Sequence, residues 1–350
     1  MLPPGSTIGI LGGGQLGRML SLAAAQLGYR VLVFSPEEHS VAAEVSAGWY
    51  NAHWHDAAAL ADFAAQCDVV TWEWENVPTA PLAMIADKLA APLRALEVAQ
   101  DRLAEKQFAA RLGGQPAPFA PVDDFGGLAA ALEQVGTPAI LKTRREGYDG
   151  KGQWRIDAVG DAEALDLPGQ SMICEARVAF AAEFSVILVR GRDGGIRFWD
   201  SAHNVHQEGM LATSTLPAPA IVQEQVAAAR DLAARVAEAL DYVGVLTCEF
   251  FATANGPVFN EMAPRVHNSG HWTIEGAATN QFTGHIRAIC GLPLGDTRTV
   301  ADRMEMRNIV GEEALDPYAC LSDPDTHLHL YAKRDALEGR KMGHVTRLWR

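Results

Sequence analysis

The sequence predicts a mixed α/β and α+β protein with an N-terminal doubly wound, Rossmann-like unit, a central domain and a small C-terminal lobe. Two observations carry this prediction. Residues 7–11 (TIGIL) and 30–35 (RVLVFS) are apolar runs separated by a glycine turn and an amphipathic stretch, the pattern of a parallel β-α-β unit. After the stretch GGQPAP, several strand-like segments follow one another, which is typical of an α+β domain.

The expected elements follow in chain order. The first helix runs from the glycine turn to Leu27, and the N-terminal unit continues with helix 57–66, strand 68–73 and an Ala-rich helix near 95–112. The central part has helices over 127–135, 221–240 and 280–290, strands over 138–143, 153–157, 171–175, 183–190 and 196–201, and a hairpin over 245–261. We expect domains at 1–104, 105–292 with a lid loop at 144–153, and 293–350.

The composition is that of an ordinary globular protein, with 48% hydrophobic and 21% charged residues among 350. A net charge of −14 argues against nucleic acid or an anionic membrane as a partner. The five scattered cysteines form no C-x-x-C and favour reduced thiols. We expect no export signal, because the N-terminal stretch lacks a basic region followed by a longer apolar one, and no apolar run approaches the roughly 18 residues of a membrane helix. We therefore expect a cytoplasmic protein that binds small molecules.

The stretch GILGGGQLGR places Gly12, Gly14 and Gly17 in a G-x-G-x-x-G pattern after the first strand. Backbone N–H groups in such a turn, together with the following helix N-terminus, favour an anion. Glu37 or Glu38 at the end of the second strand could bind a ribose, so an NAD-dependent oxidoreductase is one alternative. The spacing alone does not select NAD over another phosphate.

A basic, glycine-rich loop follows the strand at 138–143. In ILKTRREGYDGKGQW, Lys142, Arg144, Arg145 and Lys151 alternate with glycines. In a chain of net negative charge, this concentration of cations indicates a mobile lid over a polyphosphate. The alternative is a solvated basic hairpin.

Two glutamates in the 245–261 hairpin form a candidate metal site. Glu249 interrupts an apolar strand, where an unpaired carboxylate is costly to bury. A three- or five-residue loop would place it opposite Glu261, whereas a two-residue turn would separate the pair. Facing carboxylates with Asn260 beside them suit Mg²⁺, and the alternative is a pair of solvated glutamates.

The next loop, Arg265 to His271, is rich in donors suited to a small oxyanion. His267 and His271 have zinc-ligand spacing, but no third ligand is evident. Glu73 and Glu75 either bind a sugar or amine or simply end a strand, and the basic segment 331–344 is by itself an ordinary solvated tail. A phosphate lid, a carboxylate pair and an oxyanion loop together favour ATP-dependent ligation over hydride transfer or a non-catalytic nucleotide-binding regulator.

The segments that carry a family resemblance span the chain in order: GILGGGQLGRML, QDRLAEKQF, LKTRREGYDGKGQW, HNVHQEG, FNEMAPRVHNSGHWTIEGAATNQFTGHIRAICGLPLG and GRKMGHV. In these segments the sequence resembles the N5-carboxyaminoimidazole ribonucleotide synthetase family of ATP-grasp enzymes. The resemblance implies an ATP-grasp fold and the carboxylation of 5-aminoimidazole ribonucleotide by ATP and bicarbonate, through carboxyphosphate, in purine (IMP) biosynthesis. It also implies Mg²⁺ and a homodimer.

The resemblance further implies roles for single residues. ATP would be bound by Arg102, Lys142, Gly147, Tyr148, Asp149, Gly150, Lys151, Gly152, Gln153, Glu175, Ala176, Arg177, Val178, Glu183, His206, Asn260 and Glu261. Mg²⁺ would be held by Glu249 and Glu261. The catalytic residues would be Arg265, His267, Asn268, Asp149 and Lys333. The ribonucleotide would lie against Gly14, Gln15, Leu16, Glu75, Tyr148 and Arg340, which gives the opening glycine loop a role that is not NAD binding.

One residue departs from the family pattern. The lid usually carries two glycines before its tyrosine, and Glu146 replaces the first of them. We expect the Glu146 side chain to point outward to solvent. The runner-up within the fold is the formate-dependent glycinamide ribonucleotide transformylase, which shares the glycine turn and the lid but not RVHNSGHW.

Overall fold

The computed structural model describes residues 1–123, 126–147, 152–164 and 169–350. The N-terminal domain is built on a four-stranded parallel sheet of order β3 (Gly48–Asn51), β2 (Arg30–Ser35), β1 (Thr7–Leu11) and β4 (Val69–Trp72). The helices of this domain are α1 (Gln15–Gln26), α2 (Ala57–Ala65) and α3 (Thr79–Leu82). The predicted parallel β-α-β unit is confirmed, and α1 ends before Gly28, whose φ of 79° terminates a helix at no steric cost.

The Ala-rich segment near 95–112 forms two helices, not the single helix expected. They are α4 (Arg94–Ala99) and α5 (Arg102–Arg111). Asp101 between them has an extended backbone, and its carboxylate accepts hydrogen bonds from Leu103 N and Ala104 N at 3.0 and 3.3 Å. This N-cap starts helix α5, and Arg102 is the first residue of that helix.

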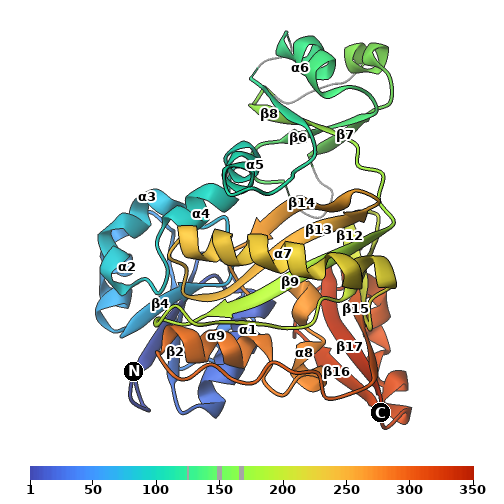
Figure 1. Cartoon of the computed structure of the whole chain (residues 1–350). Coiled ribbons are helices and arrows are strands. Elements are labelled where there is room, and N and C mark those ends of the chain that lie inside the picture. Colours follow the sequence, from blue (N-terminus) through green and yellow to red (C-terminus); the bar gives the residue numbers. More distant parts are fainter. Residues whose placement is uncertain (124–125, 148–151, 165–168) are drawn as a thin grey trace.

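A separate small lobe carries the lid loop. Its antiparallel sheet has the order β5 (Phe119–Val122), β8 (Met172–Ala176), β6 (Ala139–Thr143) and β7 (Gln153–Ile156), and α6 (Gly127–Val135) packs against it. This lobe stands above the body of the protein in Figure 1. Its core is small and is formed by residues such as Leu128, Leu132 and Leu141.

The body is a large antiparallel sheet of order β14 (Gly256–Ala263), β13 (Gly244–Thr253), β9 (Ala182–Arg190), β11 (His203–Gln207), β12 (Met210–Leu216), β15 (Arg303–Val310), β17 (Lys341–Trp349) and β16 (Thr326–Leu330), with β10 (Ile196–Phe198) paired to β9. Helix α7 (Ala220–Ala239) lies across this sheet, and α8 (Thr273–Gly276) and α9 (Gln281–Ile289) follow the hairpin (Figure 1). The C-terminal strands therefore continue the sheet of the central domain through the β12–β15 pair.

Within the described ranges, no helix is long and apolar enough to cross a membrane.

Candidate active site

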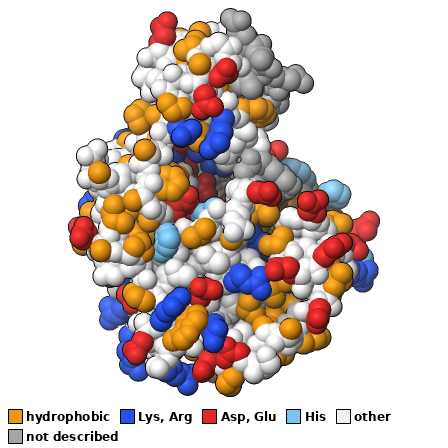
Figure 2. Space-filling model, turned by 90° about the vertical axis from the view of Figure 1, so that its right-hand side faces the viewer, with side chains coloured by type: hydrophobic (Ala, Val, Ile, Leu, Met, Phe, Trp, Pro, Cys, Tyr) orange, Lys and Arg blue, Asp and Glu red, His pale blue; other side chains and the backbone are white. Residues whose placement is uncertain are grey.

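A cavity of about 630 Å³ lies where the N-terminal domain, the lid lobe and the large sheet meet. Figure 2 shows this face hollowed below the upper lobe, where acidic and basic side chains gather. Most of the residues predicted to form the site line it: Gly14, Gln15, Leu16, Glu75, Arg102, Lys142, Gly147, Gln153, Glu183, His206, Glu249, Asn260, Glu261, Arg265, His267 and Asn268. Segments more than two hundred residues apart in the sequence thus converge on one space.

Glu249 and Glu261 face each other across β13 and β14 because of a β-bulge, which the sequence did not predict. The strands join through a two-residue turn, since Thr253 pairs with Gly256, and such a turn alone would separate the glutamates. A β-bulge between Glu249 and Phe250 leaves Asn260 unpaired and shifts the register by one residue. Glu249 therefore pairs directly with Glu261.

The two carboxylates lie in opposite electrostatic environments. Burial and, next to it, the charge of Glu261 raise the pKa of Glu249 to about 7. Burial acts in the same direction on Glu261, but Arg102 and Lys142 outweigh it and lower the pKa of Glu261 to about 2. Arg102 Nη1 donates to Glu261 Oε2 at 2.9 Å. Glu261 is thus ionised, and a divalent cation between the two would favour ionisation of Glu249 as well.

The donor set fits Mg²⁺. Two facing carboxylates and the Asn260 amide, which also lines the cavity, are hard oxygen donors of the kind that this ion prefers. The Asn260 carbonyl accepts a hydrogen bond from Lys106 Nζ at 2.6 Å, which fixes the backbone of the bulge. No group of three or more His, Cys, Asp or Glu residues that could hold a metal ion occurs among the described residues.

The loop after β14 presents Arg265, His267 and Asn268 to the cavity. Arg265 forms a bidentate ion pair with Glu75, in which Nη2 lies 2.8 Å from Oε1. The carbonyl of the preceding Pro264 accepts hydrogen bonds from Trp72 Nε1 at 2.7 Å and Tyr242 Oη at 2.6 Å. The start of the loop is therefore fixed against both the N-terminal domain and the body of the sheet.

Asn268 and His267 complete this donor loop. Neither Oδ1 nor Nδ2 of Asn268, both buried, has a hydrogen-bond partner within the described part of the chain, and the residue lines the cavity. Buried polar atoms of this kind point to a ligand that satisfies them. Burial and the charge of Arg265 lower the pKa of His267 to about 3, so its imidazole is neutral. His271, by contrast, turns away to Gln281 and His344, so the two histidines do not share a metal.

On the lid side, Glu175 lies between two lysines. Its Oε2 is 2.9 Å from Lys142 Nζ and 3.3 Å from Lys106 Nζ, and although burial opposes it, these cations lower the pKa of Glu175 to about 2. Arg102 also donates to the carbonyl of Gly147, at the start of the lid loop. Sequence reasoning missed Lys106 and Glu105, although both stand in the quoted motif QDRLAEKQF at helical spacing from Arg102.

At the far end of the cavity, Glu183 and His206 form an ion pair with 2.6 Å between Oε2 and Nδ1. Burial lowers the pKa of His206, but Glu183 and Glu249 outweigh it and raise the value above its usual range. The neighbouring segment Ala176–Val178 does not line the cavity; Ala176 N and Arg177 N bond to the carbonyls of Pro118 and Pro138.

The glycine turn is filled by an acidic side chain of the protein itself. The Glu73 carboxylate accepts hydrogen bonds from Gly14 N at 2.8 Å and Gly17 N at 3.2 Å. A Cβ atom at Gly12 would come within 2.6 Å of that carboxylate, so the glycine allows this close approach. Burial raises the pKa of Glu73. The donors expected for a dinucleotide phosphate are thus already engaged, which removes the basis for NAD binding here.

Several predicted residues lie elsewhere. Gly152, Glu175, Ala176, Arg177, Val178, Lys333 and Arg340 are not among the described residues lining the cavity. Tyr148, Asp149, Gly150 and Lys151 lie outside the described residues. Lys333 donates to the Lys341 carbonyl at 2.7 Å, and it is Lys341, not predicted as a site residue, that lines the cavity.

Glu146 is exposed and is one of the residues that line the cavity. Its φ of 62° lies in the left-handed region, which favours glycine and explains why glycine is usual there.

A lysine-bearing lid lobe over an antiparallel sheet, with an arginine and paired glutamates facing it, is the arrangement of an ATP-grasp enzyme, an ATP-dependent ligase. The family model described as ATP-grasp domain matches residues 107–282. Those of the ribonucleotide synthetase preATP-grasp domain and the phosphoribosylaminoimidazole carboxylase C-terminal domain match 5–100 and 305–349.

The chain belongs to the N5-carboxyaminoimidazole ribonucleotide synthetase family. It is 48% identical to N5-carboxyaminoimidazole ribonucleotide synthase of Brucella melitensis over 99% of this chain and 97% of that protein. The crystal structure of the synthetase from Thermus thermophilus matches with 45% identity and a TM-score of 0.91 over 97% of this chain and 93% of that one. The synthase from Aspergillus clavatus, in complex with ADP and 5-aminoimidazole ribonucleotide, matches with 30% identity and a TM-score of 0.89 over 98% and 94%.

Proposed function

We propose that this protein carboxylates 5-aminoimidazole ribonucleotide with ATP and bicarbonate in purine biosynthesis, giving N5-carboxyaminoimidazole ribonucleotide, ADP and phosphate. A bicarbonate oxygen attacks the γ-phosphorus of ATP, and the bond to ADP breaks to give carboxyphosphate. Carboxyphosphate then releases phosphate and CO₂. The exocyclic amine of the ribonucleotide attacks the CO₂ carbon, forming the N–C bond and losing a proton.

The observation that carries the proposal is the convergence of three parts on one cavity. The tip of the glycine loop, the carboxylate pair and the donor loop all line it. An enzyme that makes a short-lived acyl phosphate needs its amine acceptor in the same enclosed space, because water would otherwise destroy the intermediate. A transformylase would share the phosphate-binding part, but the RVHNSGHW loop favours bicarbonate as the oxyanion.

We assign the ATP phosphates to Arg102, Lys142 and the lid loop, and Mg²⁺ to Glu249 and Glu261 with Asn260. Bound Mg²⁺ would neutralise charge on the transferring phosphoryl group. The ion pairs of Glu175 with Lys142 and Lys106 support this assignment, because they fix two positive charges close together on the lid side of the site. The adenosine part would extend toward Glu183 and His206.

We assign bicarbonate and the developing carboxyphosphate charge to Arg265, His267 and Asn268. Gln15 and Leu16 would contact the ribonucleotide, with Glu75 positioned through its pair with Arg265. The resemblance supports Asp149 as acceptor of the amine proton, and Lys333 and Arg340 as cations toward the anionic substrates. Lys341 adds a further positive charge on the cavity wall. A bound ribonucleotide distant from residues 13–16 would contradict the first of these assignments.

An assay of ADP release tests the function. ADP release should require both 5-aminoimidazole ribonucleotide and bicarbonate. ATP hydrolysis that is indifferent to either, or that responds instead to formate with glycinamide ribonucleotide, would overturn the proposal.

The family resemblance also supports a cytoplasmic homodimer. Light scattering on the purified protein tests the oligomeric state, and a monomer mass at micromolar concentration would contradict it.

A further inference from the structure

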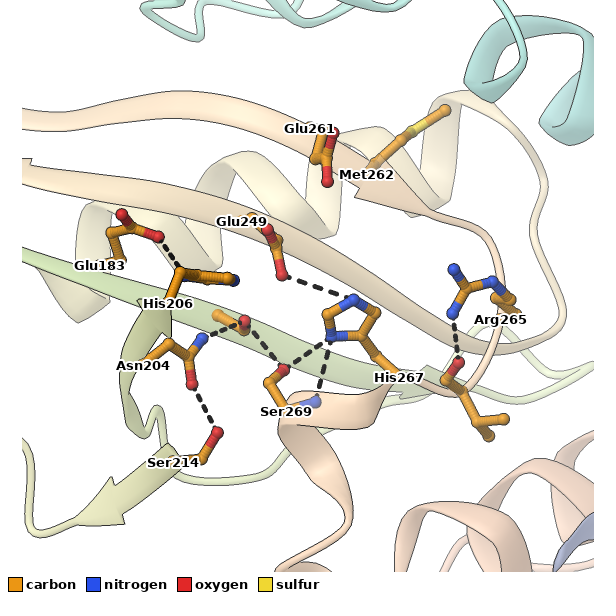
Figure 3. A network of polar contacts seen from close by, with 12 residues as sticks. Glu183, Asn204, His206, Ser214, Glu249, Glu261, Met262, Arg265, His267 and Ser269 are labelled. Carbon is orange, nitrogen blue, oxygen red and sulfur yellow. Dashed lines mark hydrogen bonds and ion pairs between the residues drawn. The ribbon is translucent and has the colours of Figure 1, made fainter. Parts of the chain in front are cut away.

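Four buried polar side chains next to His267 form a continuous chain of hydrogen bonds (Figure 3). Ser214 Oγ donates to Asn204 Oδ1 at 2.8 Å, and Asn204 Nδ2 donates to Ser185 Oγ at 2.7 Å. The Ser185 and Ser269 hydroxyl oxygens are 2.9 Å apart. The Ser269 hydroxyl in turn lies 2.8 Å from His267 Nδ1.

The sheet register brings these residues to one face. Ser185 on β9 pairs with Glu249 on β13, and Asn204 on β11 pairs with Glu183 on β9 and Ser214 on β12. Residues paired directly across strands point to the same side of a sheet. The chain of serines and Asn204 therefore lies on the same side as the carboxylate pair, next to it and not on the opposite face.

The direction of the hydrogen bonds is set at the His267 end. The backbone N–H of Ser269 points at Nδ1 over 3.3 Å, and a backbone N–H can only donate. Nδ1 is therefore an acceptor and carries no proton. The Ser269 hydroxyl, which also faces Nδ1, donates its hydrogen there, because two lone pairs would otherwise oppose each other.

The other end of the chain agrees with this direction. The Asn204 amide donates to Ser185, so the Ser185 oxygen accepts and its single hydrogen is available for Ser269. Either hydroxyl of that serine pair can donate in isolation, but only donation from Ser185 leaves every member satisfied. The imidazole proton must then reside on Nε2, which faces Glu249 Oε1 at 3.4 Å on the cavity side.

We propose that Ser185 and Asn204 are positioning residues for the reaction: through Ser269 they hold His267 as its Nε2–H tautomer, so that a hydrogen-bond donor faces the bicarbonate-derived oxyanion. The inference rests on the proposed function, since it assigns His267 to that oxyanion. A donor stabilises developing negative charge, whereas the lone pair of the other tautomer would repel it. In metal sites, removing the hydrogen-bond partner that fixes a histidine tautomer typically costs about ten- to a hundredfold in metal affinity or activity.

The substitution Asn204→Asp tests the direction of the chain with little change of shape. A carboxylate only accepts, so the Ser185 hydrogen turns toward it and the Ser269 hydrogen turns toward Ser185, which leaves the backbone N–H of Ser269 as the remaining donor of this network to Nδ1. Nitrogen-15 NMR of protein labelled in its histidine rings reports the tautomer directly, with the His267 signals assigned by their loss in His267→Asn.

In the wild type we expect Nδ1 of His267 to resonate as an unprotonated nitrogen and Nε2 as a protonated one. In Asn204→Asp, where Nδ1 loses its hydroxyl donor, we expect the signals of the Nδ1–H tautomer to appear beside those of the wild-type tautomer, with kcat lowered about tenfold and the KM for ATP unchanged. Ser185→Ala removes the contact to the Ser269 oxygen but leaves the Ser269 hydrogen on Nδ1, so it should keep the wild-type tautomer and lower kcat less than Asn204→Asp does. Ser201→Ala is the matched control, because Ser201 is equally buried and has no hydrogen-bond partner within the described residues. It should behave as the wild type.

A wild-type His267 with its proton on Nδ1 would overturn the inference, as would full kcat and an unchanged tautomer in Asn204→Asp. The NMR result stands apart from the proposed function: absence of bicarbonate-dependent ADP release would refute that function, while the ring signals would still decide the tautomer.

Discussion

Glu249 and Glu261 lie directly opposite each other on neighbouring strands because Asn260 bulges out of the hairpin. Without the bulge, the two-residue turn would direct the two carboxylates to different faces of the sheet. The bulge thus creates the candidate metal site and, at the same residue, offers a carbonyl to Lys106 from the helix that carries Arg102.

The carboxylate pair should be indispensable for turnover. Glu249→Gln and Glu261→Gln each remove one charged Mg²⁺ ligand, so ADP release should fall by about a hundredfold or more. Circular dichroism and urea unfolding would show that the variants are folded. Glu224→Gln, an exposed glutamate on α7, is the control and should keep its activity. Near-full activity in either site variant would mean that the metal lies elsewhere.

The glycine turn should depend on Glu73. Glu73→Gln keeps one acceptor but turns an NH₂ group toward the other backbone N–H, so one buried donor loses its partner. We expect the free energy of unfolding to fall by about 1–3 kcal/mol in urea titrations. Glu38→Gln, at an exposed glutamate, should change it little. Equal stability of Glu73→Gln and the wild type would show that Gly14 and Gly17 do not need this carboxylate.

Glu105 should make stability depend on pH. Burial, together with the charge of Glu261, raises the pKa of Glu105 from 4.5 to about 8. The stability contributed by its protonated form is fully present below the unfolded value and is lost as pH rises through the folded value. Glu105→Gln cannot lose a proton and keeps an acceptor for Met262 N. Its stability relative to the wild type should therefore increase from about pH 5 to about pH 9.

The measurement for Glu105 is the urea midpoint in buffer free of magnesium and nucleotide, so that the charge of Glu261 is not altered by a ligand. The exposed Glu97→Gln variant on the preceding helix serves as control and should give a difference that is flat with pH. A flat difference for Glu105→Gln as well would contradict the shifted pKa.

Glu146→Gly should stabilise the protein. The left-handed backbone destabilises the folded state by about 1–2 kcal/mol for a residue with a side chain. Glycine removes this cost, but its greater freedom in the unfolded chain offsets part of the gain. We expect a net gain of about 1 kcal/mol or less in urea unfolding, with little effect on ATP binding. A KM for ATP more than about tenfold lower, equivalent to about 1.4 kcal/mol, would show that the Glu146 side chain is directed at the phosphates and not at solvent.

The sequence predicted local structure well and long-range pairing poorly. The β-α-β unit could be predicted because Thr7–Leu11 and Arg30–Ser35 are apolar runs with a glycine turn between them. Strands β11 and β12 were missed because His203–Gln207 is largely polar and the middle of Met210–Leu216 consists of Thr and Ser, so neither segment is an apolar run. The union of the C-terminal lobe with the central sheet depends on the β12–β15 pair, for which no local signal exists.

In the candidate site, too, local features could be predicted from the sequence and long-range contacts could not. Residue types and spacing identified Glu249, Glu261, Arg265 and Lys142, which the structure brings to one cavity. They could not show that Asn260 is a bulge, because many residues can occupy that position. Nor could they show that Glu73 fills the glycine turn or that Lys341 lines the cavity, since both depend on how separate domains pack.

The central claim is that bicarbonate attacks the γ-phosphorus of ATP, and oxygen-18 transfer tests it most directly. With labelled bicarbonate, ATP and 5-aminoimidazole ribonucleotide, one labelled oxygen should appear in each inorganic phosphate released, as read by phosphorus-31 NMR. Phosphate that carries no label from bicarbonate, and takes its new oxygen from water instead, would contradict the account.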